Sequence, residues 1–390
     1  MFLQSWIPIS MGMTQEEPFH FIDEPFGNGD IEGDREGESI GGMMEKTRLG
    51  RTNLLVTRLG WGGIPIQRVS EEEGVAVIRA LIEMGVDLLD TARGYTNSEH
   101  RIGLALQKTK RPVTLSTKSA VRTEKIYKDV QTSLKEMEVK KISIYHLHAV
   151  NHFQDYEKVL GTGGAYGGLK RAREEGLIDY IGITSHNLKV LERAIEDGYF
   201  DVIMACYSFL EPDAAEKVFP LAKARDIGIL TMKPFSGGVI GEAGPALRFV
   251  LSTPDIVPIP GSESLEKARE NWEIFTKSYS LTKKDKKYIE ILRKEMNQQF
   301  CRRCDYCQPC SEKISIQHIL GLKTIVKRFG PVTQELDWFY SLVEKARDCS
   351  ECGECLTRCP YELPIPKLIR ENLAWYDQWL EENKKKRAQL

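Results

Sequence analysis

Short apolar runs alternate with longer amphipathic segments between residues 54 and 276. The short runs are apolar at nearly every position, as in strands that are buried on both faces. Eight runs are expected to be strands: Val56–Gly60, Val86–Asp90, Val113–Lys118, Ile142–His148, Tyr180–Thr184, Val202–Ala205, Gly228–Met232 and Ile256–Ile259. A helical pattern follows each of them: Glu71–Met84, Glu99–Gln107, Glu124–Met137, Phe153–Glu175 with a glycine-rich interruption, Leu188–Glu196, Ala214–Ala224, Ala246–Leu251 and Leu265–Thr276.

Eight strand-then-helix units over about 250 residues predict an α/β fold, a (β/α)8 TIM barrel. A doubly wound open sheet is the alternative. That alternative is weakened because no expected strand runs into a G-x-G-x-x-G turn.

The chain flanking this region has a different composition. Residues 27–34 are glycine-rich and acidic without an apolar period, so we expect residues 1–43 to be a disordered leader or an over-read start. The barrel domain is assigned to residues 44–300 and ends in a charged helix, Leu281–Phe300, with Thr282 as its N-cap. A smaller domain is assigned to residues 301–390, with helical patterns at Ile314–Phe329, Gln334–Lys345 and Pro366–Leu390.

The overall charge argues against some classes of partner. The 54 basic and 56 acidic residues give a net charge of −2, so a nucleic-acid partner held by bulk positive field is not expected. The sequence contains neither an apolar run of about 18 residues nor a secretory signal pattern, so we expect a cytoplasmic protein without a membrane partner.

Reactive residue types stand at the ends of three successive expected strands. Asp90, Lys118 and His148 close these strands, and Tyr95 follows Asp90 in the next loop. In a TIM barrel the carboxyl ends of the strands meet at one mouth, where the active site lies. A lysine ammonium lowers the pKa of a neighbouring tyrosine phenol, and a carboxylate paired with the lysine fixes its position. This combination predicts a general acid that protonates the oxygen of a carbonyl as hydride arrives at its carbon.

These residues lie in motifs that resemble the aldo/keto reductase family. The segment from Gly85 to Tyr95, the Ser98–Gly103 segment, the Ser116–Lys118 run and the Tyr145–His148 run occur in the family's order. The resemblance covers about residues 46–275. It implies a reductase that uses NADP or NAD, and we expect NADP. The resemblance implies that Tyr95 is the proton donor and that Lys118 and Asp90 tune it. His148 is implied to orient the carbonyl.

The same resemblance implies a set of cofactor contacts. Thr184 and Ser185 take the positions that hold the nicotinamide carboxamide, and Met232 replaces a tyrosine that stacks on the ring, a substitution a thioether tolerates. In the adenosine segment, Lys267 replaces an arginine and lacks its guanidinium fork. The full set of implied cofactor contacts is Gly62, Gly63, Thr184, Ser185, Met232, Lys233, Ser262, Ser264, Lys267, Glu270 and Asn271.

The cysteines are concentrated in the smaller domain. Eight of the nine lie between Cys301 and Cys359, in two runs with ferredoxin-like spacing, the second of which ends in Cys-Pro. In such runs the fourth cysteine usually binds the other cluster. Two [4Fe–4S] clusters are expected, and two zinc sites are the alternative. The ligands are Cys301, Cys304, Cys307, Cys310, Cys349, Cys352, Cys355 and Cys359. Cys206 is expected to be a buried, apolar-like residue. The domain resembles the ferredoxin-like module of a subgroup of aldo/keto reductases.

Together these features predict an oxidoreductase that interconverts a small-molecule carbonyl and an alcohol and is coupled to iron–sulfur electron transfer. An electron-carrier protein such as ferredoxin is the expected partner. Clusters move single electrons whereas nicotinamide moves a hydride, so a flavin would be needed to link them directly. The alternatives are a flavin-containing iron–sulfur reductase and an electron-transfer or assembly subunit that uses the barrel as a scaffold. We expect the iron–sulfur module to cover the mouth of the barrel, since a redox module is useful near the active site.

Overall fold

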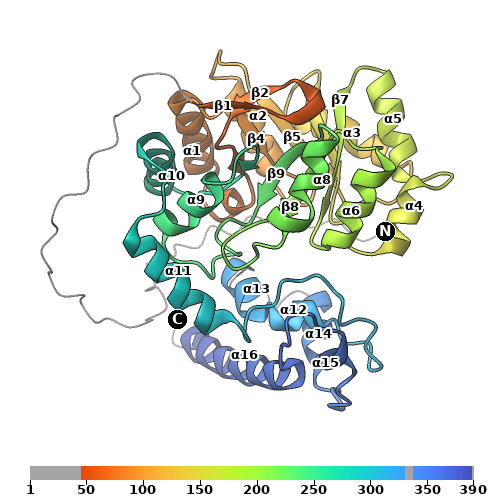
Figure 1. Ribbon diagram of the computed structural model, residues 1–390, viewed down its shortest axis with the longest axis vertical. Helices are drawn as coiled ribbons and strands as arrows, with labels where there is room; N and C mark the ends of the chain where they lie inside the picture. The colour runs from red at the N-terminus through yellow and green to blue at the C-terminus, as the bar shows by residue number, and fades with distance from the viewer. Residues whose placement is uncertain (1–44, 330–336, 389–390) are drawn as a thin grey trace, which may run out of the picture. The chain divides into compact units, whose positions relative to one another are not determined.

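The computed structural model describes residues 45–329 and 337–388 (Figure 1). The leader expected at residues 1–43 lies outside the described residues. An eight-stranded parallel sheet runs in the order β3 to β10, each strand beside its neighbour in sequence. Its strands are β3 (Trp61–Gly62), β4 (Leu88–Asp90), β5 (Thr114–Ser119), β6 (Ile142–Leu147), β7 (Ile178–Ser185), β8 (Val202–Cys206), β9 (Gly228–Met232) and β10 (Val257–Pro258).

Backbone hydrogen bonds close this sheet into a barrel. The N–H of Gly60 donates to the carbonyl of Pro258 at 3.0 Å, and the N–H of Gly62 donates to that of Pro260 at 3.1 Å. The first and last strands are therefore joined, and the TIM-barrel expectation is confirmed.

The first expected strand was wrong in position. Within Val56–Gly60, only the start belongs to a strand, β2 (Leu55–Thr57), which pairs antiparallel with β1 (Lys46–Arg48) in a separate two-stranded sheet. The first barrel strand is β3, which pairs in parallel with β4. The apolar pattern continues from one strand into the next, so it did not show where the chain changes sheet.

The helices around the barrel match the amphipathic pattern closely. The Glu71–Met84 helix begins at a Ser70 capping box, in which the hydroxyl and the Glu73 side chain each accept a backbone N–H. Two expected helices are split in two, one of them at the glycine-rich interruption. The helices are α1 (Glu71–Met84), α2 (Ser98–Leu106), α3 (Ile126–Glu136), α4 (Phe153–Leu160), α5 (Ala165–Glu174), α6 (Leu188–Asp197), α7 (Ala214–Lys217), α8 (Phe219–Ala224), α9 (Ala243–Leu251) and α10 (Leu265–Lys277).

Apolar side chains fill the inside of the barrel, which is therefore a packed core rather than a pore. Alternate strand residues point inward and form one buried cluster, which includes Leu88, Ile144, Met204, Leu230 and Val257. A larger cluster lies between the strands and the surrounding helices. The chemistry is therefore left to the residues at the strand ends.

The chain leaves the barrel through α11 (Lys283–Met296), whose N-cap is Thr282 as expected, in a capping box with Asp285. The residues beyond it form a mainly helical body with its own apolar core. Its helices are α12 (Ile316–Leu320), α13 (Leu322–Phe329), α14 (Asp337–Ala346), α15 (Glu354–Arg358) and α16 (Ile365–Ala388). We call residues 301–388, as far as they are described, the module. Among the described helices, none is long and apolar enough to cross a membrane.

The module contacts the barrel at the carboxyl ends of the strands. Arg303 pairs with Glu211, in the loop after β8, at 3.0 Å. The Tyr306 hydroxyl donates to the Asn187 side chain, just after β7, at 2.9 Å. Asp305 lies 3.3 Å from His152, which follows β6. These contacts confirm the expectation that the module covers the mouth of the barrel.

Candidate active site and iron–sulfur sites

Asp90 and Lys118 form a buried ion pair at the ends of β4 and β5. The Lys118 Nζ atom lies 2.5 Å from Asp90 Oδ2 and 2.7 Å from the Thr91 carbonyl oxygen, and both side chains are almost fully buried. Burial alone would lower the pKa of Lys118, but the Asp90 carboxylate outweighs it, so the pKa is raised. Lys118 is therefore held as an ammonium in a fixed place.

Tyr95 lies beside this ammonium in the loop after β4. The Lys118 Nζ atom is 5.1 Å from the centre of the Tyr95 ring, and the nearby phenol adds to the effect of Asp90 in raising the pKa of Lys118. His148 directly follows β6, and its ring meets Tyr95 edge to face with the ring centres 6.0 Å apart. The structure thus brings together all four residues expected to be catalytic.

Two further side chains, which the sequence reasoning did not select, brace this group from inside the barrel. The Ser116 hydroxyl donates to Asp90 Oδ1 at 2.7 Å, and the His146 Nε2 atom lies 3.0 Å from the same hydroxyl. The Ser116 hydroxyl donates its only proton to Asp90, so its oxygen must accept a hydrogen bond from the His146 Nε2–H group. Burial, with a smaller effect from Lys118, holds the pKa of His146 well below its usual range, so the ring is neutral.

His146 fits here only because its neighbour on β7 is Gly182. A Cβ atom at Gly182 would lie 2.1 Å from the His146 Nδ1 atom. The signal for both positioning residues was present, since Ser116 and His146 stand in the same short runs as Lys118 and His148. Neither of them is assigned a role at the site from the sequence alone, because a polar residue at the end of a buried strand often serves only packing or hydrogen bonding within the fold.

Ser116→Ala is expected to lower the turnover rate about 10- to 100-fold, because losing a hydrogen bond to a charged group costs about 1.5–3 kcal/mol. Asp90 would keep only the Lys118 bond and lose its fixed orientation. Steady-state kinetics checks this, with Ser133→Ala as the control. Ser133, on α3, is equally buried, but its hydroxyl oxygen lies 3.3 Å from the hydroxyl oxygen of Tyr145, away from Asp90. Equal effects of both changes would contradict a positioning role for Ser116.

The residues expected to hold the nicotinamide lie at the mouth. Thr184 and Ser185 end β7 and are buried, and Met232 ends β9 and is half-buried. The Thr184 hydroxyl oxygen accepts the Ala149 N–H at 2.8 Å, and its own proton remains available to donate. A hydroxyl of this kind suits the carboxamide of a nicotinamide, and a thioether can cover the face of its ring.

Gly62 and Gly63 have a structural explanation in the packing of β3. Their N–H groups donate to the carbonyls of Pro260 and Asp90, at 3.1 and 2.7 Å. A Cβ atom at Gly62 would meet the Ile259 carbonyl oxygen at 2.8 Å, and one at Gly63 would meet the Ser98 hydroxyl at 2.5 Å. Close approach of chain segments thus accounts for both glycines without a ligand.

Several side chains of the expected adenosine segment already have partners. The Ser262 hydroxyl accepts from the Trp61 indole at 3.2 Å, and Ser264 caps α10 by accepting the Lys267 N–H. The Lys267 ammonium lies 2.6 Å from Glu263 Oε1. Glu270 is exposed, and Asn271 is buried. This end of the cofactor site therefore offers less positive charge than the sequence alone indicated.

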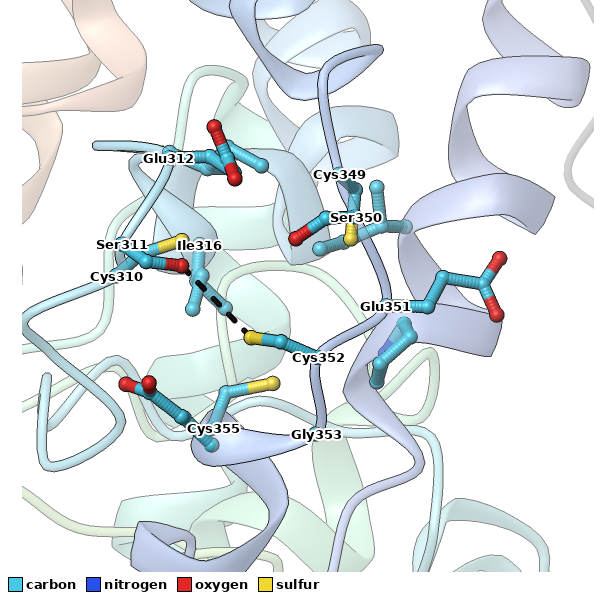
Figure 2. Close-up of a pocket in the computed structure, with 14 residues that line it drawn as sticks. Cys310, Ser311, Glu312, Ile316, Cys349, Ser350, Glu351, Cys352, Gly353 and Cys355 are labelled. Atoms are coloured by element: carbon cyan, nitrogen blue, oxygen red, sulfur yellow. Dashed lines mark hydrogen bonds between the residues drawn. The ribbon is translucent and has the colours of Figure 1, made fainter.

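The eight clustered cysteines line two separate cavities in the module. Cys310, Cys349, Cys352 and Cys355 surround the first, which we call the outer site, and Figure 2 shows their sulfur atoms turned toward one common space. The second, the inner site, is lined by Cys301, Cys304, Cys307 and Cys359. Each site takes three cysteines from one run and the fourth from the other, the exchange expected for a two-cluster ferredoxin.

The donor set at each site fits a [4Fe–4S] cluster. Four cysteines line each cavity, and such a cluster is held by four cysteine thiolates. Burial also raises the pKa of Cys304 to about 11, which a bound metal core would offset by favouring the thiolate.

The two sites differ in exposure. Cys352 of the outer site is exposed. The pKa of its thiol is lowered mainly by the Glu354 N–H and to a smaller extent by the Ser311 hydroxyl, which lies 3.7 Å away. Cys307 of the inner site is buried. The N–H of Arg303, the residue that contacts the barrel through Glu211, donates to Cys301 Sγ at 3.4 Å. The inner site is thus connected to the barrel, and the outer site reaches solvent.

A parallel barrel with an Asp–Lys–Tyr–His group at its mouth fits an oxidoreductase. Family models agree with this, since residues 57–245 match the aldo/keto reductase family and residues 300–364 match a 4Fe–4S dicluster domain. Residues 57–245 therefore form an aldo/keto reductase domain, and a 4Fe–4S dicluster domain follows it at residues 300–364.

Curated relatives match about half of this chain. L-galactose dehydrogenase of Arabidopsis thaliana is 25% identical over 222 residues, which is 52% of this chain and 69% of that protein. D-threo-aldose 1-dehydrogenase of a Pseudomonas species is 25% identical over 232 residues, 49% of this chain and 70% of that protein. A third relative, a probable aldo-keto reductase of Glycine max, is matched over 62% of its length.

Solved structures support the fold. An aldo-keto reductase from Bacillus halodurans superposes with a TM-score of 0.56 at 22% identity and covers 64% of this chain and 96% of its own. A glycerol dehydrogenase from Gluconobacter oxydans gives a TM-score of 0.53 at 16% identity, covering 63% of this chain and 94% of its own.

Proposed function

We propose that the barrel interconverts a carbonyl compound and its alcohol with a nicotinamide dinucleotide. The observation that carries this proposal is the buried Lys118 ammonium, which is held by Asp90 and lies 5.1 Å from the centre of the Tyr95 ring. A scaffold without chemistry would gain nothing from this arrangement, since a buried ion pair is a weak source of stability. The intact group therefore favours an enzyme over the alternative of an assembly subunit.

Each residue has a distinct role in the proposed reaction. A bound nicotinamide would supply the hydride or accept it. Tyr95 donates its phenolic proton to the carbonyl oxygen, and Lys118 stabilises the phenolate left behind. His148, in edge-to-face contact with Tyr95, orients the carbonyl oxygen. Asp90, Ser116 and His146 keep the ammonium in place.

The geometry favours NAD over the NADP expected from the sequence. An adenosine 2′-phosphate needs a cation, whereas a carboxylate suits the 2′-hydroxyl of NAD. Lys267, the residue in the implied arginine position, is paired with the Glu263 carboxylate. Gly261 stands where the family commonly has a lysine, so that cation is missing as well. Glu263 would face the added phosphate with a like charge.

Glu263→Gln is expected to raise the ratio of kcat/KM for NADPH to that for NADH about 3- to 10-fold. The change frees Lys267 from a partly exposed pair, an effect of about 1 kcal/mol. The matched control is Glu273→Gln on α10, the helix of Lys267, because Glu273 pairs with Lys277 at 2.9 Å in the same four-residue spacing. A strong preference for NADPH in the unmodified protein would contradict the assignment of NAD.

The module is proposed to act as the electron-transfer part of the same enzyme. A bound [4Fe–4S] cluster exchanges single electrons, and both cysteine sets fit such a cluster. The exposed rim at Cys352 offers a place where a one-electron carrier protein such as ferredoxin would dock. The inner site lies toward the barrel mouth through Arg303 and Tyr306.

Titration of the anaerobically purified chain with NADH and with NADPH tests the proposed function directly. Binding would change the fluorescence of the nicotinamide, and a carbonyl compound would then oxidise the bound cofactor. Failure to bind either dinucleotide, with a flavin released on extraction, would favour the alternative of a flavin-containing iron–sulfur reductase.

A further inference from the structure

A second group of polar side chains lies where the module meets the barrel, and it includes Lys233, one of the cofactor contacts implied by the family resemblance. His186 directly follows β7, and Lys233 directly follows β9. The Lys233 Nζ atom is 2.9 Å from the His186 Nε2 atom. Two strand ends thus bring an imidazole and an ammonium together at the mouth.

The Lys233 contact determines the tautomer of His186. An ammonium has only donors, so the Nε2 atom must accept, and a neutral imidazole then carries its proton on Nδ1. Burial, followed by the charges of Lys233 and Arg303, holds the pKa of His186 well below its usual range, so the ring is neutral. The Nδ1 atom is buried and has no hydrogen-bond partner. A buried N–H donor without an acceptor is costly, unless a ligand supplies one.

The surroundings of this donor are rich in positive charge. Arg303, from the module, is half-buried and pairs with Glu211, yet its buried Nε atom also has no hydrogen-bond partner. Lys233 and Arg303 bring two positive charges against the single negative charge of Glu211. His148 and His318 lie close enough to His186 to affect its ionisation. The charged groups that act most strongly on His186 are therefore positive, while the Asp305 carboxylate lies 3.3 Å from His152 at the same interface.

We propose that His186 and Lys233, with Arg303 of the module, bind a carboxylate of the carbonyl substrate. The inference rests on the proposed function and names its substrate class, an oxo acid. His148 connects the two groups, because it touches the Tyr95 ring and also lies near His186. A substrate whose carbonyl oxygen meets Tyr95 would place its carboxylate toward His186. The module then completes the active site as well as holding the clusters.

Paired substrates and three variants test this. With a 2-oxo acid, His186→Phe is expected to raise KM about 10- to 100-fold, the cost of losing a hydrogen bond to a charged group. With the uncharged methyl ester of the same acid, KM should change little. His186→Asn keeps an N–H near the Nδ1 position and should restore much of the affinity for the acid. The control is His100→Phe. His100 lies on α2, and its Nε2 atom is 3.6 Å from a carboxylate oxygen of Glu71 on α1.

Calorimetry with oxamate, an unreactive carboxylate, separates the binding site from the reaction. Binding to the anaerobic holoprotein that is lost in His186→Phe and kept in His186→Asn supports the site, even if no carbonyl is turned over. Such a result without turnover would count against the proposed function alone. Equal oxamate binding by His186→Phe and the unmodified protein would overturn the site. A loss of NADH affinity as large as that of oxamate would also overturn it, because the donors would then serve the dinucleotide.

Discussion

Tyr95→Phe is expected to lower carbonyl reduction about 10²- to 10⁴-fold, the contribution of a positioned proton donor. The change removes only the hydroxyl beside the Lys118 ammonium and leaves the ring that meets His148. Dinucleotide binding should stay nearly the same, because the cofactor contacts lie on β7, β9 and α10. Steady-state rates and fluorescence titration measure the two effects separately.

The control is Tyr180→Phe in the same barrel. The Tyr180 hydroxyl donates to the Thr52 carbonyl oxygen at 2.6 Å, away from the catalytic group. This variant should retain its turnover rate. Undiminished turnover in Tyr95→Phe would remove Tyr95 from its assigned role.

Cys359→Ser is expected to remove the inner cluster and spare the outer one. The unmodified chain should contain about eight irons and eight labile sulfides after anaerobic preparation, from two clusters with four cysteines each. The variant should contain about four of each, although Cys359 belongs to the second run of cysteines. The reason is that Cys359 lines the cavity of Cys301, Cys304 and Cys307.

Two companion variants make the assignment specific. Cys355→Ser should remove the outer cluster instead, and the two variants should lose different signals in electron paramagnetic resonance. Cys206→Ser should keep all the iron, since Cys206 is buried at the end of β8 and lines neither cavity. Loss of the same cluster in Cys355→Ser and Cys359→Ser would contradict the crossed ligand sets. Two zinc ions without visible absorbance would contradict the clusters themselves.

The order of strands and helices could be predicted from the sequence because its signals are local. Apolar period, caps such as Ser70 and Thr282, and cysteine spacing each lie within a few residues. The catalytic group could be predicted because strand ends of a parallel barrel must converge. The first barrel strand could not, since Trp61–Gly62 is short and adjoins the β2 strand of the other sheet.

The polar neighbours of the site depend on long-range packing that no local pattern encodes. The place of His146 requires the missing side chain of Gly182 on the next strand. The pairing of Arg303 with Glu211 joins positions 92 residues apart. The four-residue spacing of Glu263 and Lys267 was visible in the sequence, but only the structure shows that their side chains meet, at 2.6 Å.

Isotope transfer tests the central claim, carbonyl reduction by nicotinamide hydride at the barrel mouth, most directly. The anaerobic holoprotein is given a carbonyl substrate and NADH carrying deuterium at C4 of the nicotinamide ring, in both stereochemical forms. Mass spectrometry of the alcohol is predicted to show deuterium on the carbinol carbon with one form and none with the other. Alcohol whose carbinol hydrogen comes from solvent in both cases would contradict the account.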